Sequence, residues 1–162
     1  MDKILVPIGG LKTNSASHIL TTFVGSCVAV CMYDTQNKIA SMSHVMQPTN
    51  VHNVDIDIKR LGKFADEAIP NMISQMERRG SDKKSIIAKI AGGAKTFSYE
   101  CDDDDNIYNI GRRNAESIKQ SLHFHNIELH SEDIGNQNGR WVTLNIDEGL
   151  IQVKTKLGIK TL

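Results

Sequence analysis

The sequence predicts an α/β protein of the α+β type, built as a layered sandwich of mixed, largely antiparallel β-sheets with two main helices packed outside. Short apolar runs rich in β-branched residues recur along the chain, and turn residues separate them. Two longer stretches carry apolar residues at helical spacing. The length of 162 residues suits one hydrophobic core. We therefore expect residues 1–162 to form a single domain in which helices cover the sheets.

Short apolar runs mark the expected strands. The run Cys27–Tyr33 is apolar on both faces, which is typical of a central strand, and the turn-forming stretch Asp34–Asn37 follows it. The next run, Ile39–Met46, is expected to return as its hairpin partner. Residues 11–18 are small and polar, and we expect a loop there. The full set of predicted strands is, in order, Ile4–Val6, Ile19–Phe23, Cys27–Tyr33, Ile39–Met46, Ile86–Ile90, Ile127–Ile134, Arg140–Ile146 and Leu150–Thr155.

Two stretches have the periodicity of amphipathic helices. Apolar residues recur every three or four positions over Leu61–Met76, and a glycine at Gly80 is placed to end that helix. Pro70 lies inside the pattern and predicts a kink or a division there. The second helix is expected over Asn109–Asn126, with one apolar stripe.

Composition and charge argue against several classes of protein. Lysine and arginine together number 19, as do aspartate and glutamate, so a nucleic-acid binder with a broad basic face is disfavoured. The first residues carry no secretory signal pattern, and no apolar run is long enough to span a membrane. We expect a cytoplasmic protein that is not inserted in a membrane, with its three cysteines as reduced thiols.

Cys27 and His44 are the residues best suited to chemistry. Cys27 follows a small-residue turn, Gly25-Ser26, and His44 lies near the end of the next predicted strand. With Tyr33 and Lys38 taken as the pair that flanks the hairpin turn, Cys27 is six residues back and His44 six residues on. In a regular antiparallel pair the two then face each other, with Cβ atoms about 4.5–5.5 Å apart. An imidazole at that distance activates a thiol as a nucleophile.

The competing interpretation is purely structural. In it, Cys27 is a small buried hydrophobic residue and His44 is a core or rim histidine. If the pair is catalytic, a third group is needed to orient the imidazole, and Thr21 and Thr22 both lie close enough in sequence. The backbone N–H groups of Ser26 and Cys27 would then supply an oxyanion hole.

Other residues of chemical interest favour neither a metal nor a cofactor. On a strand, Cys27 and Cys31 lie about 13 Å apart, too far to bind one zinc ion. The glycines of Gly92–Thr96 do not match a phosphate-binding loop, so we expect a close-packed turn. The acidic run Asp102–Asp105 lacks the spacing of a calcium loop, and Cys101 beside it is expected to be a loop residue.

Several segments together resemble the chemoreceptor glutamine deamidases of bacteria and archaea, the CheD family. The resemblance runs over residues 18–157, and its motifs occur in the order found in that family. The matching segments are Gly25–Cys31, Ser43–Pro48, Lys63–Asp66, Ala88–Ala94, Ile110–Asn114, Asp133–Gly135 and Gly139–Arg140.

The resemblance implies a layered sandwich fold and a protein-glutamine glutaminase, which converts receptor glutamines to glutamates and releases ammonia. It implies Cys27 as nucleophile, His44 as general base and Thr21 as the group that orients the histidine, with no cofactor. The implied partners are the cytoplasmic helices of methyl-accepting chemoreceptors and a CheC-type phosphatase. Hydrolysis of receptor methyl esters is a related activity. The alternative is an adaptor that stimulates a CheC-type phosphatase and deamidates little.

Overall fold

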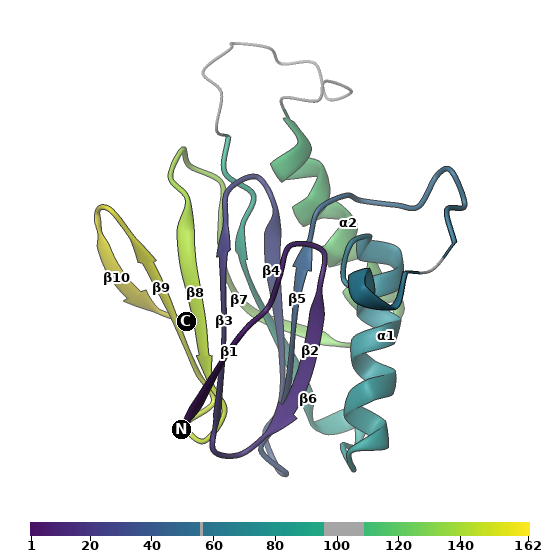
Figure 1. Cartoon of the computed structure of the whole chain (residues 1–162), viewed down its shortest axis with the longest axis vertical. Helices are drawn as coiled ribbons and strands as arrows, with labels where there is room; N and C mark the ends of the chain where they lie inside the picture. Colours follow the sequence, from purple (N-terminus) through teal and green to yellow (C-terminus); the bar gives the residue numbers. More distant parts are fainter. Residues whose placement is uncertain (56, 96–108) are drawn as a thin grey trace.

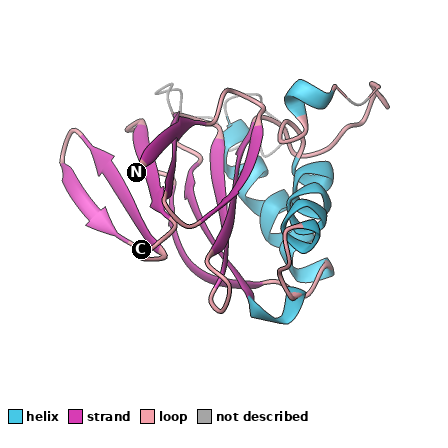
Figure 2. Ribbon diagram, turned by 60° about the horizontal axis from the view of Figure 1, so that its bottom comes forward, coloured by secondary structure: helices cyan, strands magenta, loops and turns pink. Residues whose placement is uncertain are grey.

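The computed structural model describes residues 1–55, 57–95 and 109–162. Over these residues it shows two five-stranded sheets stacked face to face, with two α-helices on the outer side of one sheet (Figures 1 and 2). The predicted α+β sandwich is therefore confirmed. Neither of the described α-helices is long and apolar enough to cross a membrane. Cys101 and the run Asp102–Asp105 lie outside the described residues.

The first sheet has the strand order β1-β3-β8-β9-β10. Strand β1 runs parallel to β3, and the other neighbours are antiparallel. No described helix covers its outer face (Figure 2). Its strands are β1 (Asp2–Leu5), β3 (His18–Val24), β8 (Arg140–Asn145), β9 (Leu150–Thr155) and β10 (Gly158–Thr161).

The second sheet has the order β2-β5-β4-β6-β7 and carries the helices. Strand β4 lies at its centre, between β5 and β6, as the apolar faces of Cys27–Tyr33 predicted. Only β7 is parallel to its neighbour. The strands are β2 (Leu11–Ser15), β4 (Val28–Asp34), β5 (Ile39–Val45), β6 (Ile86–Gly92) and β7 (Glu128–Ile134).

Two strands were not predicted from the sequence. Strand β2 was expected to be a loop, because Leu11–Ser15 is mostly polar and only Thr13 is buried. Strand β10 is short, and all four of its residues are exposed. Both are edge strands with a single neighbouring strand and few buried side chains. Their sequences therefore lack the apolar alternation from which a strand is predicted.

The α-helices are α1 (Ala65–Arg78) and α2 (Ile110–Phe124). Helix α1 begins four residues later than predicted and runs through Pro70 without dividing. Its buried side and that of α2 pack together and onto the second sheet. Two short 3₁₀ helices, η1 (Ile58–Arg60) and η2 (Lys83–Ser85), flank α1 within the described chain.

Two hydrophobic layers result from this stacking. One lies between the second sheet and the helices and includes Met72, Met76 and Ile118. The other lies between the two sheets and includes Leu20, Met42 and Leu144. Cys27 is half-buried at the edge of the inter-sheet layer. The β3–β4 turn that carries it lies at the upper end of the molecule in Figure 1.

Candidate active site

Cys27 is held by the end of strand β6. The backbone N–H of Gly93 donates to the Cys27 carbonyl at 2.9 Å, and that of Ala94 donates to the Gly25 carbonyl at 2.9 Å. Gly92 has φ of +130°, and a Cβ there would lie 2.3 Å from the Cys27 carbonyl oxygen. Only glycine permits this approach. The predicted close-packed turn at Gly92 therefore fixes the backbone of the cysteine.

His44 lies on the same side of the second sheet as Cys27. It pairs with Ala29 across the β4–β5 ladder and is 3% exposed. Side chains alternate along a strand, so Ala29 and Cys27 point to one side, into the space between the sheets. Cys27 and His44 are thus diagonal neighbours on one face, a separation that long side chains reach across.

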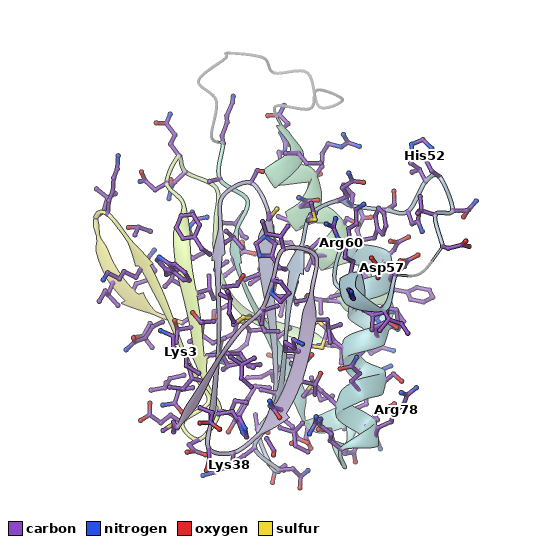
Figure 3. The ribbon with its side chains drawn as sticks, viewed as in Figure 1. Lys3, Lys38, His52, Asp57, Arg60 and Arg78 are labelled. Carbon is purple, nitrogen blue, oxygen red and sulfur yellow. The ribbon has the colours of Figure 1, made fainter. Side chains whose placement is uncertain are left out.

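The predicted register of this hairpin is wrong by two residues. The turn spans Thr35–Lys38, and the pair that closes it is Asp34 and Ile39. The Asp34 carboxylate accepts the N–H groups of Gln36 and Asn37, and Lys38 adopts a left-handed φ of +51°. Lys38 is thus a turn residue, at the end of the molecule opposite to the β3–β4 turn (Figure 3). Cys27 and His44 are diagonal rather than directly opposite, but a shift of two residues keeps both on one face.

A hydrogen-bond chain fixes the proton on His44. The Thr22 hydroxyl lies 2.8 Å from His44 Nδ1 and 2.9 Å from the Val6 carbonyl oxygen. A carbonyl only accepts, so the single hydroxyl proton goes to Val6. His44 Nδ1–H must then donate to the Thr22 oxygen, and the lone pair of the neutral ring is on Nε2. The imidazole is oriented as a base.

The burial of both groups sets their resting charge. Burial raises the pKa of the Cys27 thiol, and burial lowers the pKa of His44 to about 4. At neutral pH the pair therefore rests as a neutral thiol and a neutral imidazole. A neutral imidazole is able to accept a proton, and these shifts disfavour a preformed thiolate–imidazolium ion pair.

The backbone N–H groups of Ser26 and Cys27 are candidate donors for an oxyanion. Among the described residues, the backbone N–H groups of Ser26 and Cys27 make no hydrogen bond to the protein. They precede β4, where the ladder has not yet begun. Free N–H groups at a nucleophile are the arrangement that stabilises a tetrahedral oxyanion.

Sequence comparisons show the family of the chain as a whole. The profile of the family described as CheD, chemotactic sensory transduction, matches residues 46–155. A probable chemoreceptor glutamine deamidase CheD of Clostridium botulinum is 39% identical over 159 residues, covering 95% of this chain and 94% of that protein. The chain belongs to the CheD family. Its similarity extends to archaeal proteins of the same printed name, with 38% identity over 156 residues in Archaeoglobus fulgidus (96% and 95% covered) and 32% over 157 residues in Methanococcus maripaludis (97% of each).

The resemblance to the CheD family implied that Thr21 orients His44, and the hydrogen bonds of the Thr21 hydroxyl run to another strand. The Thr21 hydroxyl donates to the Val142 carbonyl at 3.1 Å and lies 3.1 Å from the Thr143 hydroxyl, both on β8. Thr21 and Thr22 are adjacent on β3, so their side chains point to opposite faces of the first sheet. Thr22, the other candidate, is the one that contacts His44.

The contacts of Thr21 and Thr22 predict different effects for two adjacent substitutions. Thr22→Val removes the acceptor for His44 Nδ1–H, so the ring loses its fixed tautomer. We expect kcat of glutamine hydrolysis to fall by about 10²-fold. Thr21→Val removes a hydroxyl on the opposite face, and we expect kcat to stay within about twofold. Initial rates of ammonia release check both. A larger loss in Thr21→Val than in Thr22→Val would restore the role to Thr21.

The buried His44 also predicts a loss of stability in acid. An unfolded histidine has a pKa of about 6.5, whereas burial holds that of His44 at about 4. Between these values the unfolded chain binds a proton that the folded chain does not, so the free energy of unfolding falls as the pH falls. We expect about 2 kcal/mol less stability at about pH 5 than at about pH 7 from this residue alone.

Urea unfolding of the wild type and of His44→Gln at both pH values isolates this effect. The glutamine variant does not titrate, so its stability should fall less than that of the wild type. Parallel losses in the two proteins would show that His44 is not held neutral by burial.

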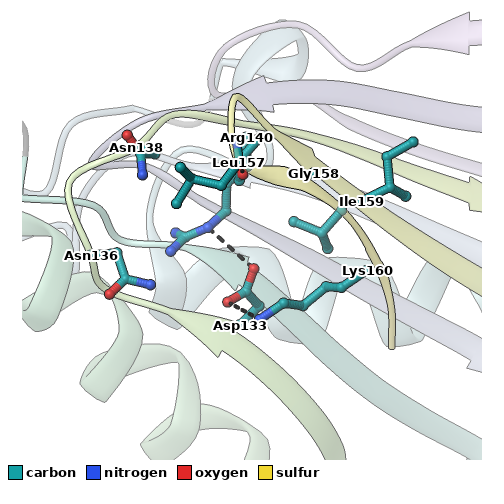
Figure 4. A pocket seen from close by; sticks show the side chains of 10 residues that line it. Asp133, Asn136, Asn138, Arg140, Leu157, Gly158, Ile159 and Lys160 are labelled. Carbon is teal, nitrogen blue, oxygen red and sulfur yellow. Dashed lines mark hydrogen bonds and ion pairs between the residues drawn. The ribbon is translucent and has the colours of Figure 1, made fainter.

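A hollow of about 210 Å³ lies beside a buried ion pair, not at Cys27 (Figure 4). Arg140 Nε lies 3.3 Å from the Asp133 carboxylate, and Lys160 Nζ lies 3.3 Å from its other oxygen. The Arg140 guanidinium also donates to the carbonyls of Gly92 and Gly135. Arg140 thereby anchors the glycine that packs against Cys27.

Cys31 has no part in this site. It is 2% exposed in the layer between the sheets, and burial raises its pKa to about 12. A thiol in that environment is inert at neutral pH. Cys31 therefore serves as an internal control for the reactivity of Cys27.

Proposed function

We propose that this chain hydrolyses selected glutamine side chains of chemoreceptors to glutamate, with Cys27 as nucleophile, His44 as general base and Thr22 as the residue that positions the base. The observation that carries the mechanism is the chain of hydrogen bonds from Val6 through Thr22 to His44 Nδ1, which leaves Nε2 as the basic nitrogen on the face that Cys27 shares. The names of the relatives supply the substrate class.

The first half of the reaction forms a thioester. His44 Nε2 takes the proton of the Cys27 thiol as the sulfur attacks the side-chain amide carbon of glutamine. The oxyanion that forms is stabilised by the N–H groups of Ser26 and Cys27. His44 then gives its proton to the amide nitrogen, the carbon–nitrogen bond breaks, and ammonia leaves.

The second half returns the enzyme to its resting state. His44 takes a proton from water, and the resulting hydroxide attacks the thioester carbon. The carbon–sulfur bond breaks, glutamate is released, and the thiolate of Cys27 regains its proton from His44. A methyl ester of glutamate reacts by the same steps with methanol as the leaving group, so ester hydrolysis is included in the proposal.

The direct test uses a cytoplasmic fragment of a chemoreceptor and the purified protein. We expect ammonia release and fragment peptides heavier by the mass difference between glutamine and glutamate. A fragment whose modified glutamines are replaced by glutamate should release no ammonia. If the wild-type protein converts no glutamine but stimulates a CheC-type phosphatase, the adaptor function holds and the proposed hydrolysis is wrong.

A further inference from the structure

A buried asparagine on α2 joins the two chain segments that carry the proposed nucleophile and base. Asn114 is 0% exposed. Its Nδ2 donates to the Met46 carbonyl at 3.0 Å and lies 3.4 Å from the Ser26 carbonyl oxygen. Ser26 directly precedes Cys27, and Met46 comes two residues after His44. One amide group therefore contacts the backbone on both sides of the site.

The main chain does not bridge these two segments within the described residues, whereas the side chain of Asn114 does. The β4–β5 ladder ends at the pair Val28 and Val45. Beyond that pair, the described residues show no main-chain hydrogen bond between the Ser26–Cys27 segment and Met46. The two N–H groups of the Asn114 amide are aimed at carbonyls on these two segments, so they tie the strands together where the ladder no longer does.

The helix that presents Asn114 is seated against the cysteine turn. A Cβ at Gly111 would lie 2.6 Å from the Gly93 carbonyl carbon, so the two backbones touch. Gly93 in turn donates its N–H to the Cys27 carbonyl. Figure 1 shows the start of α2 at the same end of the molecule as the β3–β4 turn. The position of Asn114 relative to Cys27 is thus fixed by backbone contact.

Stability alone does not account for an amide at this position. The Oδ1 atom of Asn114 is buried and has no hydrogen-bond partner among the described residues. A buried polar atom without a partner opposes folding. The unpartnered Oδ1 atom is therefore destabilising, whereas the two N–H groups of the same amide donate to the segments that carry the site.

We infer that Asn114 is a positioning residue for catalysis, which sets the separation between Cys27 and His44. This inference rests on the proposed thiol mechanism. The hydrogen bonds of the Asn114 side chain go to main-chain carbonyls and not to either reacting group, so we expect it to affect the rate of the chemical step and not the affinity for the substrate protein.

Ser117 on the same helix supplies a matched control. Its hydroxyl donates to the Pro48 carbonyl at 2.8 Å, so it fastens the chain after β5 to α2 without reaching the cysteine turn. Asn114→Ala should lower kcat of glutamine hydrolysis by about 10- to 100-fold and leave KM within about twofold. Ser117→Ala should leave both within about twofold. Asn114→Ser, which keeps a polar group, repeats the test if the alanine variant folds poorly.

A second readout separates positioning from loss of structure. If Asn114 acts through the Cys27–His44 pair, its substitution should slow alkylation of Cys27 by iodoacetamide, and the double variant with His44→Gln should react no more slowly than His44→Gln alone. The inference is overturned if Ser117→Ala loses as much kcat as Asn114→Ala, if the asparagine variants keep wild-type kcat, or if the effects add in the double variant. If Cys27→Ala keeps the wild-type rate, the proposed mechanism itself fails, which is a separate result.

Discussion

Replacing His44 by glutamine is expected to lower kcat of glutamine deamidation by about 10³-fold, within the range that general base catalysis contributes. Glutamine is polar and close in size to histidine, but it cannot take a proton from Cys27. Burial raises the pKa of that thiol, so very little thiolate forms at neutral pH without the base. The initial rate of ammonia release from a receptor fragment measures the loss.

The pH dependence of kcat tests the role of His44 independently of the substitution. Because the pKa of His44 is about 4, the imidazole stays neutral and active as the pH is lowered through the range in which an ordinary histidine becomes protonated. The acid limb of kcat in the wild type should therefore lie below about pH 5. An acid limb near pH 6.5, or a His44→Gln variant with the wild-type rate, would contradict the role given to His44.

Replacing Arg140 by methionine is expected to lower the free energy of unfolding by about 3–5 kcal/mol, the range for removing the buried partner of a buried ion pair. The guanidinium is almost fully buried against the Asp133 carboxylate and donates to the carbonyls of Gly92 and Gly135. All three acceptors lose a donor in the variant. Urea unfolding monitored by circular dichroism measures the change.

Lys160 provides the control for this prediction. It also pairs with Asp133, but its side chain is 61% exposed, so water replaces the lost contact. Lys160→Met is expected to cost less than about 1 kcal/mol. Equal losses in the two variants would mean that burial of the Arg140 pair does not decide its contribution.

The sequence was enough to predict that Cys27 and His44 lie on one face of the sheet, but not to predict their separation. Two apolar runs around a polar turn are enough to predict the hairpin. The register depends on which residues form the turn. Here the Asp34 carboxylate accepts a backbone N–H within the turn and Lys38 adopts the left-handed conformation, so the four-residue turn is Thr35–Lys38, one position later than the predicted Asp34–Asn37. The resulting shift of two residues keeps Cys27 and His44 on one face, so the shared face was predicted although the register was wrong.

The choice between Thr21 and Thr22 needed the tertiary structure. Both are buried threonines, at 3% and 1% exposure, and both are close to the cysteine in sequence. Alternation along β3 puts them on opposite faces, but the sequence does not say which face meets the second sheet. In the structure, Leu20, Thr22 and Val24 form the row that is buried between the sheets, whereas Phe23, on the face of Thr21, is exposed.

The central claim is that the thiol of Cys27, and not that of Cys31, carries out the hydrolysis of receptor glutamine. The most direct measurement is the rate of glutamine-to-glutamate conversion in a chemoreceptor fragment, followed by mass, with the variants Cys27→Ala and Cys31→Ala. We predict a loss of about 10⁴-fold or more for Cys27→Ala and a rate within about twofold of wild type for Cys31→Ala, provided that both variants fold. A Cys27→Ala variant that converts the fragment at the wild-type rate would contradict the account.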